Sequence, residues 1–374
     1  MNSAQVWART MLGDGERMHG IVGYYNGAPS GDIHENRLTD FFLYSINHNY
    51  AIVDAWAQAH TRVIGSNGWA ALYHEENEND TFLSMAECSA NGEPYTIYYI
   101  GRDIDDFALP LNTSEYTATD LSVKANAVAN ANAYPVYLSV ANTASNNNYT
   151  ANAIYARLQE QLPAVQNSLL RINSNGQITY SVGTRNWGDE ALGYHLTDAE
   201  AISFAKQQLN ILGLMPQCDY RATVSKVNRY EINLSGGQNT TPETIEYTVT
   251  FYRLFNGIDV ISNQEDGIMV SFNKNGLTEL RYLWREMEIA TECKAPESGV
   301  LTLFQAQALC RDAGISQNQI STDDTICNGE YQNATVAYLQ IDNEVRPVYV
   351  FASDDCYTNC TFVDMVTGDI LSIG

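Results

Sequence analysis

The stretch LTDAEAISFAKQQLNILG, residues 196–213, opens a pattern that occurs twice in the second half of the chain. Thr197 is a good N-cap residue, apolar side chains then recur at helical spacing, and a glycine ends the stretch. The stretch LTLFQAQALCRDAG, residues 301–314, repeats this order of Leu-Thr, apolar positions and a final glycine. Two helices are therefore predicted, each beginning one copy of a repeated unit. The predicted apolar face of the first helix consists of Leu196, Ala199, Ile202, Ala205, Leu209 and Leu212.

Alternating apolar and polar residues follow each predicted helix, a pattern typical of half-buried strands. The segments are 245–260 and 267–284 in the first copy and 334–351 and 360–374 in the second. The turn signals within them are Asn256-Gly257, Asn275-Gly276, Asp342-Asn343 and Thr367-Gly368. Because type I′ turns require positive φ at both central residues, we expect it at both residues of each Asn-Gly pair. The predicted unit is a helix packed on an antiparallel meander.

The charge balance limits the partners of this protein. Its 374 residues include 20 Lys and Arg against 44 Asp and Glu, a formal charge of −24. Such a surface repels phosphate backbones and anionic lipid, so neither nucleic acid nor a membrane surface is expected as a partner. No apolar run approaches the ~18 residues of a membrane span, and the opening residues lack a basic start followed by an apolar core. Neither a membrane span nor an export signal is expected within the chain.

Composition also divides the chain. Single cores stop growing at about 250–300 residues, so a chain of this length is expected to form several domains. Residues 126–153 are rich in Ala and Asn and are interpreted as a linker around one short strand. The predicted fold class is α+β, with tandem helix-plus-antiparallel-sheet modules following an N-terminal α/β segment. The predicted domains are the N-terminal α/β segment at 1–112, a junction with a partial repeat at 113–190, a first module at 191–295 and a second module at 296–374.

Short motifs in the two modules carry a family resemblance. The matching residues are Val249, Phe251, Arg253, Gly257, Ile258 and Val260, then Ile268, Val270, Phe272 and Gly276, then Phe362, Val363, Asp364, Thr367, Gly368, Asp369 and Ile370. Together with the helix start LT-x-x-x-A, they resemble the PepSY-type domains of secreted bacterial metallopeptidase propeptides and envelope regulatory proteins. The resemblance implies a non-catalytic binding or inhibitory module outside the cytoplasm, secreted or in the cell envelope. Its expected partner is a protein such as a peptidase domain.

The first 60 residues show a second resemblance. His19, Gly20, Gly23, Tyr24, Ala55 and Trp56, with a predicted helix at 36–60, resemble the closing strand and helix of caspase/gingipain-like cysteine peptidases. In that family the catalytic His-Gly follows an apolar strand, whereas His19-Gly20 follows the polar residues GDGERM. The resemblance therefore implies the end of a peptidase-like domain, downstream of its catalytic cysteine.

A dyad of His19 and Cys88 is the alternative, in which the chain is itself a cysteine peptidase, intact or truncated. Cys88 ends the semi-apolar stretch 81–88 before two small residues, as a strand-end nucleophile would. No basic residue neighbours it in sequence, and the carboxylate of Glu87 would raise the pKa of its thiol. A buried structural cysteine is therefore favoured, and the non-catalytic interpretation assigns no catalytic residue.

No cofactor or metal is expected. The histidines lack the i, i+4 spacing that places two imidazoles on one helical face, and Cys356 and Cys360 lack a second pair of ligands. The acidic run HEENEND, residues 74–80, is interpreted as a solvated loop because it lacks the ligand ladder of a calcium loop. Trp284 and Arg285, at the end of a predicted strand, are the candidates for contact with a protein partner.

Overall fold

The structure of the chain is a computed structural model. The residues it describes are 18–24, 38–60, 69–74, 77–85, 97–102, 138–140, 152–153, 156–158, 160, 168–172, 176–183, 185, 187–232, 241–255, 257–262, 266–285, 287–289, 300–314, 334–341, 344–351 and 361–371. Cys88, the pair Cys356 and Cys360, Asn256 and the predicted turn Asp342-Asn343 lie outside them.

Helix α6 (Asp198–Leu212) begins and ends where its sequence signals predict. The Thr197 hydroxyl accepts a hydrogen bond from the Glu200 amide, the Glu200 carboxylate accepts one from the Thr197 amide, and Gly213 closes the helix with a φ of 67°. Ala199, predicted on the apolar face, lies instead in a first turn that is exposed throughout. The residues of α6 that are buried are Ala201, Ala205, Leu209 and Leu212.

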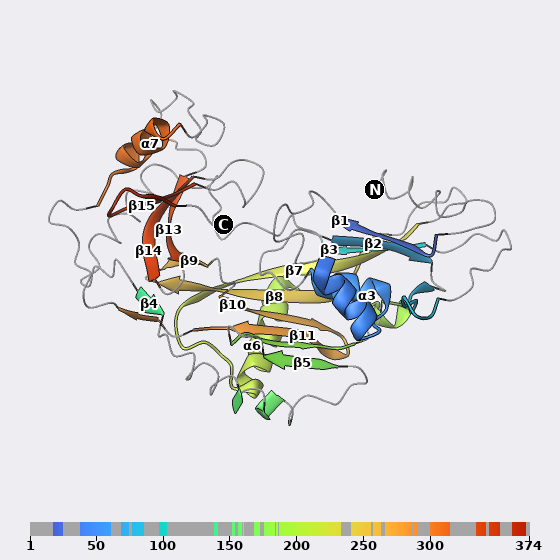
Figure 1. Ribbon diagram of the computed structural model, residues 1–374. Coiled ribbons are helices and arrows are strands. Elements are labelled where there is room, and N and C mark those ends of the chain that lie inside the picture. The colour runs from blue at the N-terminus through green and yellow to red at the C-terminus, as the bar shows by residue number, and fades with distance from the viewer. Residues whose placement is uncertain are drawn as a thin grey trace.

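A long antiparallel sheet runs through the middle of the molecule (Figure 1). Its strands, in sheet order, are β1 (Gly20–Tyr24), β2 (Trp69–His74), β3 (Ile97–Arg102), β7 (Tyr220–Ile232), β8 (Glu243–Phe255), β10 (Gly267–Asn273), β11 (Gly276–Leu283), β6 (Ile178–Ser181) and β5 (Leu169–Ile172). The N-terminal strands β1 to β3, predicted as part of an α/β segment, pair antiparallel and continue into β7. The described chain is therefore α+β throughout.

Hydrogen-bonded strands cross all three predicted domain boundaries. β3 pairs with β7 across the boundary after residue 112, and β6 pairs with β11 across the boundary after residue 190. β9 (Ile258–Ser262) pairs with β13 (Ala334–Ile341) across the boundary after residue 295. The division at 1–112, 113–190, 191–295 and 296–374 remains a prediction.

The hairpin between β10 and β11 differs from the predicted type I′ turn at one residue. Gly257 and Gly276 have positive φ, 76° and 118°, as expected, but Asn275 does not. β10 ends at Asn273 and β11 begins at Gly276, so the loop residues are Lys274 and Asn275. The register of the two strands shifts further from the loop, between Ser271 and Phe272. The position that favours glycine is therefore the first residue of β11, after the loop.

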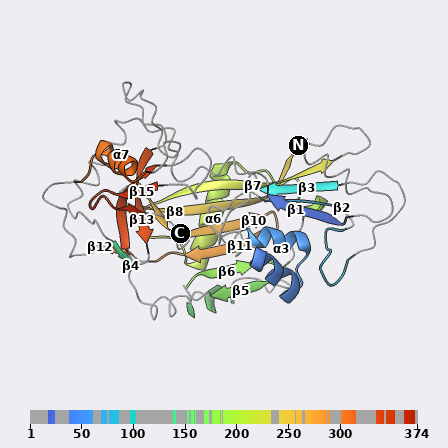
Figure 2. The same ribbon diagram turned by 45° about the horizontal axis from the view of Figure 1, so that its top comes forward.

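A second sheet continues from the end of β8 (Figure 2). Its strands, in sheet order, are β9 (Ile258–Ser262), β13 (Ala334–Ile341), β14 (Glu344–Phe351), β15 (Thr361–Asp364) and β16 (Ile370–Leu371). β9 pairs parallel with β13, and the later pairs are antiparallel. Helix α7 (Leu303–Asp312) buries Ala306 and Cys310 in the core on one face of this sheet. β4 (Leu138–Val140) pairs with the start of β14 and with β12 (Met287–Ile289).

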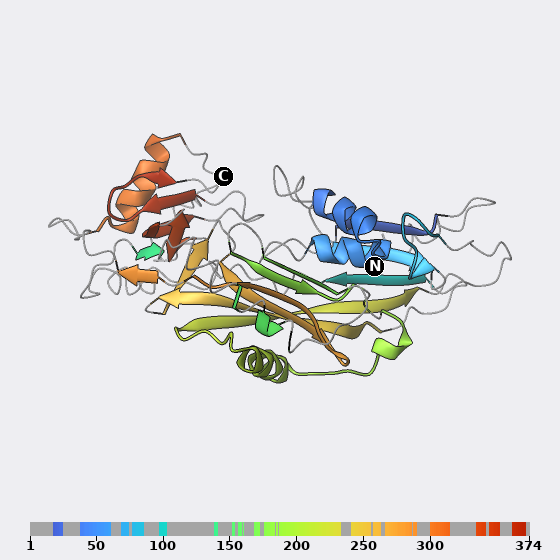
Figure 3. The same ribbon diagram turned by 60° about the horizontal axis from the view of Figure 1, so that its bottom comes forward.

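Helices cover both faces of the main sheet (Figure 3). α6 packs on one face and α3 (Ile52–Ala59) on the other, each within its own apolar cluster. The predicted single helix at 36–60 is wrong, because the π-helix η1 (Leu43–Asn47) and a bend separate its first half from α3. Asn49 has a φ of 51° in that bend, a left-handed conformation that asparagine tolerates better than most residues. The short 3₁₀-helix η4 (Asp189–Ala191) precedes α6.

Candidate functional site

Strand β8 has two buried faces of opposite chemistry. Tyr247, Val249 and Phe251 belong to the apolar core shared with α6. Glu246 and Thr248, which alternate with them, are also buried. Because successive side chains of a strand point to opposite faces, these polar groups lie on the face that α3 covers. A polar site therefore forms in the interior, between α3 and the sheet.

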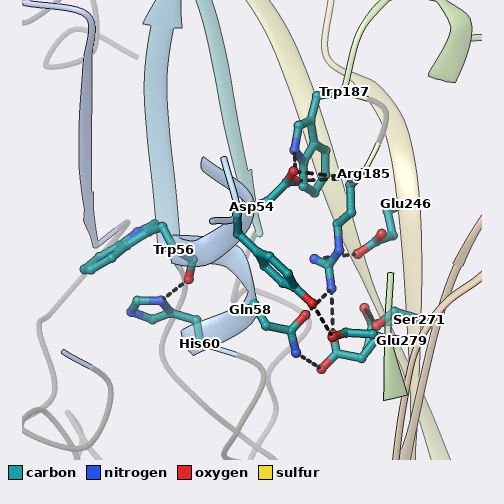
Figure 4. A network of polar contacts seen from close by, with 12 residues as sticks. Asp54, Trp56, Gln58, His60, Arg185, Trp187, Glu246, Ser271 and Glu279 are labelled. Atoms are coloured by element: carbon teal, nitrogen blue, oxygen red, sulfur yellow. Dashed lines mark hydrogen bonds and ion pairs between the residues drawn. The ribbon is translucent and has the colours of Figure 1, made fainter. Parts of the chain in front are cut away.

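Arg185 is the centre of this site, which we call the buried charged cluster (Figure 4). Its Nη2 donates to Glu279 Oε2 at 2.8 Å and to Gln58 Oε1 at 3.3 Å, and its Nη1 lies 3.4 Å from Glu246 Oε1. Gln58 Nε2 donates to the second oxygen of Glu279. Burial alone would lower the pKa of Arg185, but the nearby carboxylates of Glu246, Glu279 and Asp54 raise it, so the guanidinium is charged. The cluster consists of Asp54, Gln58, Arg185, Trp187, Glu246 and Glu279.

Asp54 is the member of the cluster whose pKa is shifted into the neutral range. Its Oδ1 accepts a hydrogen bond from Trp187 Nε1 at 2.7 Å, and both carboxylate oxygens lie 3.4 Å from the Arg185 amide nitrogen. Burial raises the pKa of Asp54 to about 7, although Arg185 and the Trp187 hydrogen bond act in the opposite direction. A low-dielectric interior disfavours a third carboxylate charge beside a single guanidinium. Asp54 therefore changes its protonation near neutral pH.

Contacts of Trp187 connect the cluster to its surroundings. The Trp187 amide donates to Glu78 Oε1 at 3.1 Å, and Arg229 Nη1 donates to the Trp187 carbonyl at 2.9 Å. Arg229 also pairs with Asp189 at 2.5 Å. The arrangement fastens α3 and the segment 185–189 to the sheet.

His19 lies in a separate polar group, on the residue before β1. Its Nδ1 lies 2.7 Å from the buried Asp80 carboxylate, and Asn77 Nδ2 donates to the same oxygen at 2.8 Å. The Asn77 amide nitrogen also lies 3.1 Å from His19 Nδ1. Cys88 lies outside the described residues, so the predicted dyad stays a prediction. The Asp80 carbonyl also accepts from the Ile52 amide at the start of α3.

The residues that carry the peptidase-like resemblance lie together around α3. Trp56 Nε1 donates to the Gly23 carbonyl at 3.1 Å, and its indole packs edge-on against the Tyr24 ring. His60 Nδ1 contacts the Trp56 carbonyl at 2.7 Å. These contacts pack β1 on the helix.

Large apolar side chains are exposed on the same N-terminal part of the molecule. Phe42 is 50% exposed and its ring stacks on Phe82, which is 40% exposed. Both rings contact Phe41, which is buried against Trp56. We call these exposed side chains the apolar patch; its members are Phe42, Ile46, Phe82, Leu83 and Met85.

A tight turn presents one half of the apolar patch. Thr81 and Ser84 exchange two backbone hydrogen bonds, at 2.8 and 3.2 Å. The Thr81 hydroxyl accepts from the amides of Leu83 and Ser84. Phe82 and Leu83 stand at the tip, where Leu83 is 74% exposed. The turn is therefore ordered by its own hydrogen bonds and is anchored at Asp80 by His19 and Asn77.

The partner-binding candidates Trp284 and Arg285 follow β11. Arg285 is only 8% exposed and lies 3.9 Å from the buried Asp266 carboxylate. The Trp284 side chain is half-buried, and the Arg253 guanidinium carbon lies 4.4 Å from the centroid of the Trp284 ring. Burial lowers the pKa of Arg285 and raises that of Asp266. The structure thus places Arg285 in the interior and leaves the Trp284 side chain partly exposed.

The described residues lack two further features. No group of three or more His, Cys, Asp or Glu side chains is arranged to hold a metal ion there. In the same part of the chain, no helix combines the length and the apolar character needed to cross a membrane.

Sequence reasoning identified neither the buried charged cluster nor the apolar patch. Glu246 and Glu279 occupy polar positions of alternating strands, which sequence alone assigns to solvent. One signal was present: the polar positions of ETIEYTVT, residues 243–250, contain Thr and Glu but no Lys or Arg. A solvent-facing row more often mixes both signs of charge.

Comparisons with known proteins identify no family for this chain. No protein-family description and no curated protein matches the chain. An uncharacterized protein from Eubacterium rectale aligns over 64% of this chain and 85% of its own, with a TM-score of 0.33 and 11% identity. YycH from Bacillus subtilis aligns over 60% of this chain and 48% of its own, with a TM-score of 0.32 and 12% identity. The chain thus spans about half the length of YycH, and structural likeness at this level supports no functional argument.

Proposed function

We propose that this protein is a non-catalytic, secreted or envelope protein that binds or restrains a protein partner such as a peptidase. The observation that carries the proposal is a contrast between two sites. The buried charged cluster is internally paired and closed, whereas the apolar patch exposes large side chains on an ordered turn. Exposed apolar clusters of this kind mark interaction surfaces in folded proteins.

The proposal includes tandem PepSY-like modules, which two pairs of matching contacts support. In each unit a threonine closes a capping box with the residue three positions later, Thr197 with Glu200 and Thr302 with Gln305. A tyrosine hydroxyl on the second strand donates to the carbonyl of the leucine before that threonine: Tyr247 to Leu196 at 3.3 Å, and Tyr349 to Leu301 at 2.9 Å.

Strand order and one further side chain support the same correspondence. α6 is followed by the antiparallel order β7-β8-β10-β11, and α7 by the antiparallel order β13-β14-β15-β16. Asn273 at the end of β10 accepts from the amide two residues later, and Asp364 at the end of β15 does the same. Two copies of one unit account for all of these matches.

Site-specific photo-crosslinking tests the binding function. A photoreactive residue at Leu83 should crosslink a defined protein in cells that produce the chain. The matched control is Ile211, an exposed apolar residue of α6 remote in sequence and outside the patch. Crosslinking from position 83 but not 211 is expected, and equal labelling from both positions, or none from 83, would contradict the proposal.

A cysteine peptidase is the second candidate, and the His19–Asp80 contact is the observation that favours it. A carboxylate on Nδ1 leaves Nε2 of an imidazole as a base, which is the orientation a thiol nucleophile requires. Purified protein and its Cys88→Ala variant should be assayed in parallel on a mixed peptide library. The non-catalytic proposal expects no cleavage by either. Cleavage by the parent that disappears in the variant would establish the peptidase instead.

A further inference from the structure

We infer that the apolar patch binds a protein segment whose apolar side chains are flanked by Lys or Arg. This inference rests on the proposed binding function and specifies the chemistry of the partner. Three features carry it: the composition of the patch, the order of the turn that presents it, and the charge of the segments that form it.

The patch is suited to receive apolar side chains. Phe42 and Ile46 lie one helical turn apart, and Phe82 stacks on Phe42 from the neighbouring turn. The buried Phe41 ring contacts both of these rings and also packs against Trp56. Aromatic side chains that pack on a buried core are typical of the centres of protein interfaces.

The turn that carries Phe82 and Leu83 is ordered before any partner binds. Its backbone hydrogen bonds and the Thr81 hydroxyl hold the tip, and the His19–Asp80–Asn77 group holds its base. A preordered surface loses less conformational entropy on binding than a loop that must fold. The exposure of Leu83 is therefore a fixed property of this surface.

The charge of the surrounding sequence selects a basic partner. Segments 38–60 and 69–88, which supply the patch, contain no Lys or Arg. Asp40 precedes Phe42 by two residues, and Glu78 lies in the segment before the turn. Of the acidic side chains that the structure describes in these segments, Asp40 and Glu78 are partly exposed, whereas Asp54 and Asp80 are buried. Lys and Arg flanking the apolar side chains of a partner would complement this surface.

The same charge argues against two other occupants. A second copy of the chain would bring like charges together, since each copy has a formal charge of −24. An anionic lipid surface would meet the same repulsion. A basic segment of another protein is the occupant to which both the apolar and the acidic features point.

Binding of two matched peptides to the full chain tests the inference. Both are fluorescently labelled and have the same amphipathic leucine pattern; one has Lys and the other Glu at the polar positions. We expect the Lys peptide to bind at least about tenfold more tightly, and its affinity to fall by a similar factor between about 0.05 and about 0.5 M NaCl. The double variant Phe82→Ser/Leu83→Ser should weaken binding of the Lys peptide about tenfold, while Ile211→Ser should not.

Each outcome separates this inference from the function on which it rests. Binding of the Lys peptide that the double variant does not weaken would show only general attraction to an acidic protein, and would overturn the inference. Equal binding of the Glu peptide, lost in the double variant, would overturn the basic partner but leave the patch as a binding surface. Binding of neither peptide, with no crosslink from position 83, would overturn both proposals.

Discussion

Asp54 is fully buried against the Trp187 indole, and its pKa of about 7 lies well above the ordinary aspartate value of 3.8. Between these two values the folded protein holds a proton that the unfolded chain releases. The stabilising contribution of Asp54 is therefore fully present below about pH 4 and is lost as the pH rises to about 7, by at most about 1.4 kcal/mol per pH unit.

Asp54→Asn should remove this component of the pH dependence. The amide oxygen still accepts a hydrogen bond from Trp187, while the titrating group is gone. We expect the free energy of unfolding of the variant, relative to the parent, to rise steadily from pH 5 to pH 7. Urea denaturation across that range measures it, and parallel curves for the two proteins would show that Asp54 does not titrate there.

Arg185 is the residue whose loss should be most costly. Replacement by Met leaves Glu246 and Glu279 buried without their cation, and breaking a buried pair in this way costs about 3–5 kcal/mol. The matched control is Lys226→Met, which breaks the exposed pair with Asp198 and should cost less than about 1 kcal/mol. Equal urea midpoints for the two variants would mean that the cluster contributes no more than a surface pair.

At the scale of single elements, glycines after tight turns set the hairpin geometry. Gly276→Val and Gly257→Val each force a branched side chain into positive φ, and each should destabilise by about 1–3 kcal/mol. Gly23→Val serves as the control, because Gly23 has ordinary φ and open space around its added side chain. Thermal unfolding measures all three. If Gly276→Val melts with the parent, the first position of β11 tolerates an ordinary residue.

At the scale of the whole molecule, the two sheets have separate cores joined through β9. The cluster containing Val249 and Phe251 shares no residue with the cluster around α7. Arg185→Met should therefore speed hydrogen exchange in α3, β8 and β11 while leaving the amides of α7 and β14 protected. Val345→Ala, a cavity-forming change in the second core, should have the reverse effect. Equal acceleration everywhere by either variant would indicate a single cooperative unit.

The sequence alone determined the local elements of this protein. The caps of α6 and α7, the limits of most strands of the two units and the positive φ of Gly257 and Gly276 follow from interactions within a few residues. Such interactions are recorded directly in short patterns. The break between η1 and α3 escaped prediction because the apolar spacing continues through it.

Only the tertiary structure decided what lies on the second face of the main sheet. Asp54 and Arg185 are 131 residues apart, and Arg185 reaches Glu279 across another 94. Polar positions in β8 and β11 are compatible with either solvent or burial, and it is the docking of α3 that buries them. The patch depended in the same way on the approach of Phe42 to Phe82. Burial is a property of distant segments meeting, whereas caps and turns are properties of neighbours, so periodicity predicted the elements and could not predict these sites.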